Sequence, residues 1–378
     1  MHQLKEAGIM RHQPENSVSP PYTRPKLKAS SNNENWTAES IPNLWDKVVL
    51  ITGATSGIGR AAAEILAGKR ARVIMAARNL QKAHYVAGEI RQALPDARLD
   101  VRELELSSMD SILRFADEIL ADYSHLNVLI NNAGIMACPY AKTEDGVEIQ
   151  MATNHLGHFA LSGLMLPLLR IKRGSRIVNT SSIGHRMGKI DFTDFNWEKR
   201  KYNPTQAYAD SKLANLYFTY EFARRVSGAV LQMEAGARVG AGARAGADAR
   251  VGVGARAGAD ARAGDGARAG ISTSALTVVA AHPGWTRTGL QKHVWYMKKL
   301  NPWMSQSPAE GALPTLRAAF DPMARPGDYF GPSRFFEMHG SPILVSSSRR
   351  SHDPDAAKKL WAISEQLTNV EYLHQPDP

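Results

Sequence analysis

The chain has 378 residues, of which 43% are hydrophobic and 22% charged, so it has enough apolar content to bury a substantial core. Its formal net charge is +10, but residues 1–35 carry five Lys or Arg against three Glu, and residues 235–270 carry six Arg against three Asp. The rest of the chain is only mildly basic, which favours an ordinary solvated surface over a continuous basic surface that binds a polyanion. We therefore expect no nucleic-acid partner.

The single cysteine, Cys138, excludes an internal disulfide and indicates a reducing compartment, which predicts a cytoplasmic location. No segment approaches the roughly 18 to 20 consecutive apolar residues that a membrane span needs. Residues 1–35 lack the apolar core of a signal peptide and are rich in Pro, Ser and Asn, so they are predicted to be a disordered N-terminal tail. Three glutamates in this tail argue against a transit peptide.

From residue 47 onward, short branched apolar runs alternate with helical patterns, which is typical of a parallel sheet covered by helices. The predicted strands are Val48–Thr52, Arg72–Ala76, Val101–Leu104, Val128–Asn131, Arg176–Thr180 and Leu276–Ala281. The predicted helices are Ile58–Ala67, Leu80–Ala93, Ser108–Tyr123, Thr153–Leu169 and Ala207–Val226. The order predicts an α/β fold, with residues 36–378 forming a single Rossmann-type domain, a doubly wound parallel sheet with helices on both faces.

One segment, 235–270, interrupts this domain and consists almost wholly of Gly, Ala, Arg and Asp, with Arg at every sixth position. A period of six raises the alternative of a β-helical repeat, but each turn would need a branched apolar residue, and that position is mostly Ala. Frequent Gly makes ordering costly, so we predict a flexible insertion and no RNA-binding role. Because it joins a helix to the next strand, it should emerge at the amino ends of the strands, away from the ligand site.

A glycine-rich turn follows the first predicted strand and opens the first helix. Glycines let the backbone approach a pyrophosphate, and a helix amino end supplies unpaired N–H groups and partial positive charge. The plain alternative is an ordinary tight turn. The candidate cofactor-binding residues here are Gly53, Thr55, Ser56, Gly57, Ile58 and Gly59. Their Gly-x3-Gly-x-Gly spacing resembles the cofactor turn of the short-chain dehydrogenase/reductase family.

Further motifs stand in the order that this family has, and each has an ordinary structural alternative as a turn, cap or surface residue. The resemblance implies that Asn132, Ala133 and Gly134 border the cofactor after the fourth strand, together with Glu105 and Leu106 after the third. It implies that Pro283, Gly284, Thr286 and Thr288 hold the nicotinamide side. It also assigns Asn154 to a proton relay and Ser182 to the reacting oxygen.

Tyr208 and Lys212 lie four residues apart, so a helix would place them on one face. Tyrosine has an ordinary pKa near 10, so at neutral pH it needs a nearby cation to favour the phenolate, and Lys212 can supply one. Taken alone, this spacing also occurs on plain helix surfaces. With the other motifs it completes a catalytic set of Asn154, Ser182, Tyr208 and Lys212, and the pair also borders the cofactor in the resembled family.

Within that family the chain is similar to the retinol-dehydrogenase-like oxidoreductases, on the run Asn154–Phe159, the long interval between Ser182 and Tyr208, and the ending Leu360–Glu365. The resemblance implies NAD(P)-dependent interconversion of a carbonyl and an alcohol on a small, hydrophobic substrate, without a metal. Glu105 stands where many relatives have Asp, and the 235–270 insertion has no counterpart. Two alternatives are a catalytically inactive, cofactor-binding regulatory protein and an epimerase or dehydratase of the same fold. A homo-oligomer is left open.

Cofactor choice depends on the end of the second strand, where an NAD-preferring site usually has an acid. Here Arg78 offers a planar cation suited to a phosphate, and Arg60 offers a second one nearby. We therefore expect a preference for NADP(H) over NAD(H), with two solvated arginines as the alternative. The apolar segment Leu290–Ser305 suits either a lid over the substrate or an ordinary amphipathic helix.

Overall fold

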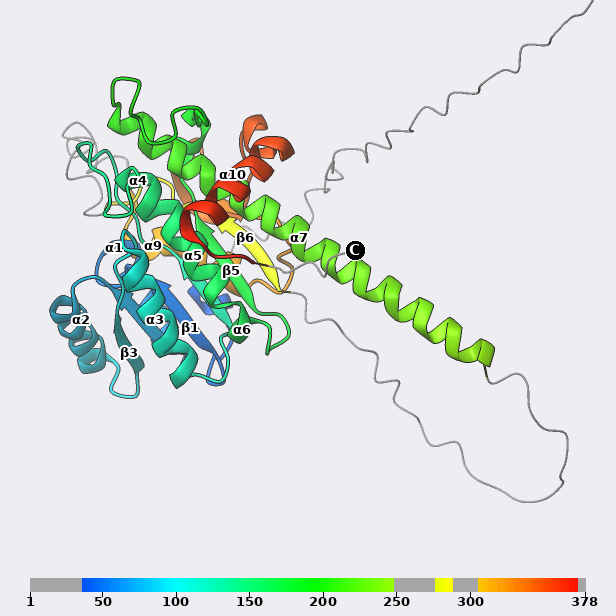
Figure 1. Ribbon diagram of the computed structural model, residues 1–378. Helices are drawn as coiled ribbons and strands as arrows, with labels where there is room; N and C mark the ends of the chain where they lie inside the picture. Colours follow the sequence, from blue (N-terminus) through cyan, green and yellow to red (C-terminus); the bar gives the residue numbers. More distant parts are fainter. Residues whose placement is uncertain (1–35, 248–275, 288–304, 373–378) are drawn as a thin grey trace, which may run out of the picture. The chain divides into compact units, whose positions relative to one another are not determined.

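The computed structural model describes residues 36–247, 276–287 and 305–372 (Figure 1). At its centre is one eight-stranded sheet in the order β3-β2-β1-β4-β5-β6-β7-β8. All neighbouring strands are parallel except the last pair, β7 and β8, which is antiparallel. The strands are β1 (Val48–Thr52), β2 (Arg72–Ala77), β3 (Arg98–Glu103), β4 (Val128–Asn131), β5 (Arg176–Thr180), β6 (Thr277–Ala281), β7 (Tyr329–Arg334) and β8 (His339–Leu344).

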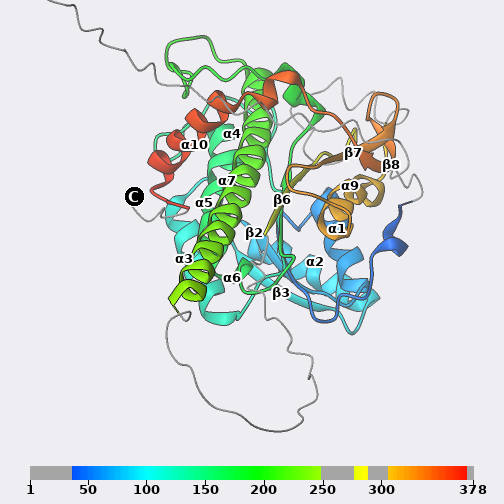
Figure 2. The same cartoon turned by 90° about the vertical axis from the view of Figure 1, so that its right-hand side faces the viewer.

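Both faces of the sheet are buried, because alternate residues of each strand point to opposite sides. In β1, Val49 and Ile51 pack into one apolar cluster, and Val48 and Leu50 pack into another. Helices cover each face, as Figure 2 shows from the side. The first cluster is closed by α1 (Gly57–Gly68), α2 (Leu80–Ala93) and α9 (Pro308–Phe320), and the second by α3 (Met109–Asp122), α5 (Gly157–Leu164), α6 (Leu166–Leu169), α7 (Pro204–Ala247) and α10 (Pro354–Thr368).

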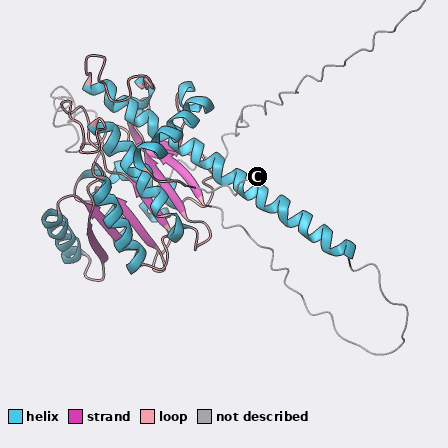
Figure 3. Ribbon diagram, in the orientation of Figure 1, coloured by secondary structure: helices cyan, strands magenta, loops and turns pink. Residues whose placement is uncertain are grey.

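Shorter elements complete the described residues: η2 (Ala38–Ser40), α4 (Ile149–Met151), the π-helical η3 (Ala152–Leu156), η4 (Ile183–Met187) and η6 (Arg349–His352). Strands flanked by helices on both sides (Figure 3) confirm the predicted doubly wound α/β fold. No helix in the described part of the chain is long and apolar enough to cross a membrane.

All six predicted strands are present, although β3 begins three residues earlier than expected, at Arg98. The helical stretch predicted over 153–169 is present, although it is not one regular α-helix. It runs as π-helical η3, then α5 and α6, and the break between α5 and α6 occurs because Pro167 near the start of α6 has no N–H group for the helix ladder. The sequence prediction also missed β7, β8, α9 and α10.

The helix predicted to end at Val226 continues as α7 through Ala247, so residues 235–247 of the predicted insertion are helical in the structure. Ala and Arg are strong helix formers and offset part of the cost of the Gly residues in this segment, and a helix already nucleated upstream needs no new nucleus to extend. Residues 248–270 lie outside the described part of the chain. The division into a tail, one domain and an insertion therefore stays a prediction. Thr277 pairs in register with Arg176, at the amino edge of the sheet.

Candidate active site

The predicted cofactor residues gather where the strand order reverses. β1 lies between β2 and β4, so helices leave its carboxyl end and that of β4 toward opposite faces. Ligands of open α/β sheets bind in the crevice at such a switch point. The glycine turn after β1 and the run Asn132–Gly134 after β4 both lie there.

The glycine turn has the shape that a pyrophosphate needs. Gly53 and Gly57 have φ values of +70° and +53°, which favour glycine. A Cβ on Gly59 would lie 2.3 Å from Gly53 O and 2.5 Å from Asn132 Nδ2, so only glycine allows this close packing. Ser56 is the N-cap of α1 and its side chain makes no capping hydrogen bond, which leaves the first-turn N–H groups to a ligand. The turn therefore fits a dinucleotide.

Thr52, the last residue of β1, connects the glycine turn to the residues after β4 and to His158 on α5. Its Oγ1 accepts hydrogen bonds from the backbone N–H groups of Asn132 and Ala133, each at 2.9 Å. The same hydroxyl lies 2.8 Å from His158 Nε2, and His158 Nδ1 lies 3.1 Å from the backbone oxygen of Asn154. Since that oxygen can only accept, Nδ1 carries the proton and Nε2 accepts from Thr52. Burial lowers the pKa of His158 to about 3, so the ring is neutral.

Asn154 is fully buried in the π-helical segment η3, where Gly157 N bonds Ala152 O, five residues back. π-Helical turns occur frequently at functional sites because they displace one residue from the regular ladder. The side-chain amide of Asn154 donates to Ile135 O and to Ser211 Oγ, both at 2.9 Å, and accepts from Ile135 N at 2.8 Å. The side chain of Asn154 therefore joins the segment after β4 to α7.

Ser182 and Tyr208 lie against each other. Ser182 caps η4 just beyond β5, and its Oγ accepts from Gly184 N at 3.1 Å. A Cβ on Gly184 would lie 3.4 Å from Ser182 Oγ and 3.5 Å from the Tyr208 ring, which places all three side by side. Burial raises the pKa of Tyr208, and its hydrogen bond with Ser182 opposes this rise. The two hydroxyls can act together on one substrate oxygen.

Lys212 lies one turn further along α7. Its Nζ donates to Thr180 O at 3.1 Å and is 5.8 Å from the centre of the Tyr208 ring. Burial lowers the pKa of Lys212 to about 8, so the ammonium remains mostly charged at neutral pH. The predicted lowering of the Tyr208 pKa is not found, because burial raises this pKa more than the hydrogen bond with Ser182 lowers it. Ser181 Oγ donates to Lys212 O at 2.9 Å and fixes α7 on β5.

Arg78 and Glu105 form an ion pair at the end of β2, with Nη1 and Oε2 3.2 Å apart. The Arg78 side chain is 77% exposed, whereas Glu105 is held by Ser107, whose hydroxyl donates to it at 2.8 Å. A carboxylate thus stands beside the cation predicted to bind a phosphate. Arg60 bonds Glu64 and Glu89 on α1 and α2, so the second predicted cation is already neutralised.

The turn after β6 is fixed by its own side chains. Thr286 Oγ1 donates to Pro283 O at 2.8 Å, and Gly284 has φ +63°, where a Cβ would lie 2.3 Å from Met338 O. The close approach of the β7–β8 turn therefore requires a glycine at position 284.

Two other predicted site elements lie elsewhere. Thr288 and nearly all of the predicted lid, Leu290–Ser305, lie outside the described residues. Leu106 is buried, and its carbonyl packs against Gly157.

The structure brings the main candidates together. A Cβ on Gly134 would lie 3.1 Å from Asn154 Oδ1 and 3.5 Å from Lys212 Nζ, so the β4 exit meets both helices of the site. Sequence reasoning missed the role of His158, although it lies one helical turn after Asn154, a spacing that places the two on one face. Its polar partner, Thr52, lies on a distant strand and could not be inferred from spacing.

A doubly wound sheet with a glycine cradle at its switch point, and a Ser, Tyr and Lys beside it, defines a dinucleotide-binding oxidoreductase. The family model described as short chain dehydrogenase matches residues 47–230. Retinol dehydrogenase 14 of Mus musculus is 36% identical over 343 residues, covering 86% of each chain. Retinol dehydrogenase 11 of Homo sapiens is 35% identical over 331 residues, with the same coverage. The chain belongs to the short-chain dehydrogenase family, in its retinol-dehydrogenase-like subgroup, and is an NAD(P)-dependent oxidoreductase.

Solved structures agree on the fold. A protein from Mycobacterium paratuberculosis is 37% identical, with a TM-score of 0.67, and the match covers 89% of this chain and 99% of that one. A short chain dehydrogenase from Shigella flexneri, complexed with NADP, is 22% identical with a TM-score of 0.52, covering 76% and 97%. The second likeness supports the fold alone.

Proposed function

We propose that the chain interconverts a carbonyl and an alcohol on a hydrophobic substrate, with NADP(H) as the preferred cofactor and Asn154, Ser182, Tyr208 and Lys212 as the catalytic set. The observation that carries this proposal is the packing of Ser182 against Tyr208, with the Lys212 ammonium 5.8 Å from the tyrosine ring and the glycine cradle at the adjacent switch point. A retinoid-type alcohol or aldehyde is the first substrate to test, since the curated relatives are named retinol dehydrogenases.

In the proposed mechanism, Ser182 and Tyr208 hold the substrate oxygen by hydrogen bonds, and Tyr208 gives that oxygen its proton during reduction or takes it during oxidation. NADP(H), held by the glycine turn, would supply or accept the hydride at the substrate carbon. Lys212, charged and held by Thr180 O, stabilises the phenolate that proton donation leaves behind. The backbone oxygen of Asn154, fixed by His158 Nδ1, accepts a hydrogen bond from a water that passes protons between Lys212 and solvent.

The cofactor preference rests on Arg78 alone, because Arg60 is paired with two glutamates. When a 2′-phosphate binds, Arg78 exchanges its exposed ion pair with Glu105 for a charge-assisted pair with the phosphate, and exposed pairs are weak enough for this exchange. Arg78→Asp should therefore lower the ratio of kcat/KM for NADPH over NADH by about tenfold or more. Glu105→Gln should raise it. A wild-type ratio below one would contradict the preference.

The activity is tested by following the absorbance of reduced nicotinamide while aldehydes and ketones of graded size and polarity are added. We expect consumption of NADPH that becomes more efficient as the substrate becomes larger and more apolar. Tight cofactor binding without turnover of any carbonyl or alcohol would instead favour the regulatory alternative. The cytoplasmic location stays a prediction from the single Cys138.

A further inference from the structure

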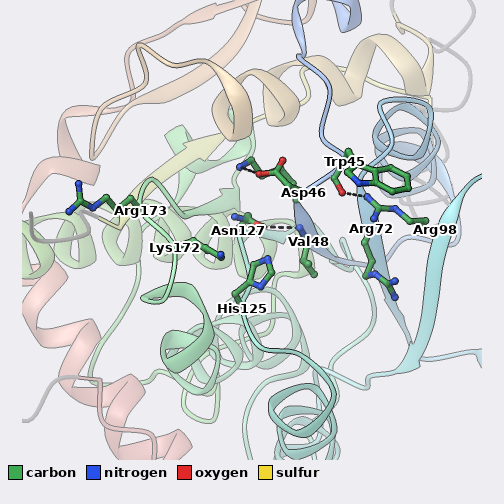
Figure 4. Close-up of a pocket in the computed structure, with 10 residues that line it drawn as sticks. Trp45, Asp46, Val48, Arg72, Arg98, His125, Asn127, Lys172 and Arg173 are labelled. Carbon is green, nitrogen blue, oxygen red and sulfur yellow. Dashed lines mark hydrogen bonds and ion pairs between the residues drawn. The ribbon is translucent and has the colours of Figure 1, made fainter.

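A pocket lies at the end of the sheet opposite the glycine turn, and Figure 4 shows the residues that line it. It is bordered by the starts of β1, β2 and β3 and by the segments that lead into β4 and β5. Its volume is about 440 Å³, within the roughly 300–1,000 Å³ typical of small-molecule sites. β1 spans the five residues from this pocket to the glycine turn, so the two sites are about 15 Å apart.

The lining of this pocket is strongly cationic. Five of its residues are Lys or Arg, namely Lys47, Arg72, Arg98, Lys172 and Arg173, against one acid, Asp46. Burial lowers the pKa of Arg98, and the neighbouring charges of Arg72 and Arg70 lower it further, ahead of the opposing effect of Asp100. Several cations in a concave site repel one another and create a positive electrostatic potential, and a bound anion would reduce this repulsion.

Several of these groups are fixed in place and others remain available to a ligand. Asp100 holds Arg72 at 3.1 Å, and Asp46 holds Lys47 at 2.8 Å. In contrast, neither Lys172 nor Arg173 has an ion-pair partner among the described residues. His125 Nε2 is buried and has no hydrogen-bond partner. The pocket thus combines the unpaired Lys172 with an enclosed, unsatisfied ring nitrogen of His125, while the side chain of Arg173 lies at the rim and points away from the other lining residues (Figure 4).

Asn127 adds a neutral donor at the centre of the pocket. Its Oδ1 accepts from Val48 N at 2.9 Å, which fixes the amide and turns Nδ2 away from Val48, toward the side where Lys172 lies (Figure 4). Donors from several directions, with several unit charges, suit a compact anion of high charge density and many acceptor oxygens. A phosphate dianion has these properties.

We propose that this basal pocket is a second ligand site, distinct from the cofactor cradle, and that it binds a phosphomonoester or pyrophosphate group through Lys172 and Asn127, with Arg173 at its rim. Such a group can belong to a small phosphorylated molecule or to a lipid headgroup. The shared chemistry is the phosphate dianion. The site is independent of the proposed catalytic activity, because its residues touch none of the catalytic set.

The test uses the full chain with saturating NADPH, so that the glycine turn is already occupied. Calorimetry with inorganic pyrophosphate should give saturable binding, and Lys172→Gln combined with Arg173→Gln should weaken it by about tenfold or more. Both residues are exposed, so the variant should fold. The matched control, Arg114→Gln with Lys358→Gln, removes two exposed charges elsewhere and should bind like wild type.

A second arm measures sedimentation with phosphatidylcholine vesicles that contain or lack phosphatidic acid, whose headgroup is a phosphomonoester. If the pocket substitutions weaken pyrophosphate binding but leave vesicle binding unchanged, the ligand is a soluble phosphorylated molecule. If they weaken binding to vesicles that contain phosphatidic acid, the ligand is a lipid headgroup. The proposal is overturned if neither probe binds, or if the pocket variant and the control variant bind both probes equally well.

Discussion

The neutral, buried His158 predicts a specific loss of stability in acid. In the folded protein its pKa is lowered to about 3, whereas an unfolded histidine has a pKa of about 6.5. Below pH 6.5 the unfolded chain binds a proton that the folded chain cannot, so the stability contributed by the neutral ring is complete above that pH and is lost as the pH falls toward 3. Each pH unit in this window costs about 1.4 kcal/mol, so pH 5 costs about 2 kcal/mol.

The assay is urea unfolding at pH 7 and pH 5 for wild type and His158→Gln, which cannot titrate. His155, whose pKa burial also lowers to about 3, titrates in both proteins, so the difference between them reports chiefly on His158. Wild type should therefore lose about 2 kcal/mol more than the variant over this interval. His84→Gln, on the exposed surface of α2, is the control and should keep the wild-type pH dependence. An equal loss in wild type and His158→Gln would refute the buried, neutral assignment.

Three further predictions concern the cradle, the reacting oxygen and the insertion. Gly59→Ala places a methyl group 2.3 Å from Gly53 O and should weaken NADPH binding by about tenfold or more in a fluorescence titration, whereas Gly88→Ala, which meets nothing within 4 Å, should not. Ser182→Ala should lower kcat by about 100-fold with little change in cofactor affinity, and a kcat within twofold of wild type would remove Ser182 from the mechanism. Deleting 235–270 should leave kcat/KM within about twofold, since long surface segments can be shortened at small cost; loss of cofactor binding in a folded deletion variant would contradict this.

The parallel core of the fold could be predicted because its strands are buried on both faces and read as continuous apolar runs, such as Val48–Thr52. The last two strands, β7 and β8, do not have such an apolar run and could not be predicted in this way. β7 and β8 contain Pro332 and Pro342, which cannot donate to a sheet ladder and are tolerated only near an edge. Their pairing is set by the rest of the sheet, and no local pattern indicates it.

The candidate site was predictable wherever chemistry depends on short spacing, as with Tyr208 and Lys212 on one helical face. It was not predictable where partners come from distant elements. The ion pair between Arg78 and Glu105 joins residues 27 positions apart, and the hydrogen bond from Thr52 to His158 spans 106. The raised pKa of Tyr208 likewise depends on burial by the whole fold, which a sequence motif does not contain.

The central claim is that Tyr208 transfers the proton that accompanies hydride transfer, and Tyr208→Phe tests it most directly. The substitution removes one hydroxyl from a buried ring and leaves the glycine cradle and Lys212 in place. The measurement is kcat for carbonyl reduction, taken together with the dissociation constant of NADPH for the same preparation. We predict a kcat at least about 100-fold below wild type with an unchanged dissociation constant. A variant that binds NADPH normally and keeps more than about a tenth of the wild-type kcat would contradict the account.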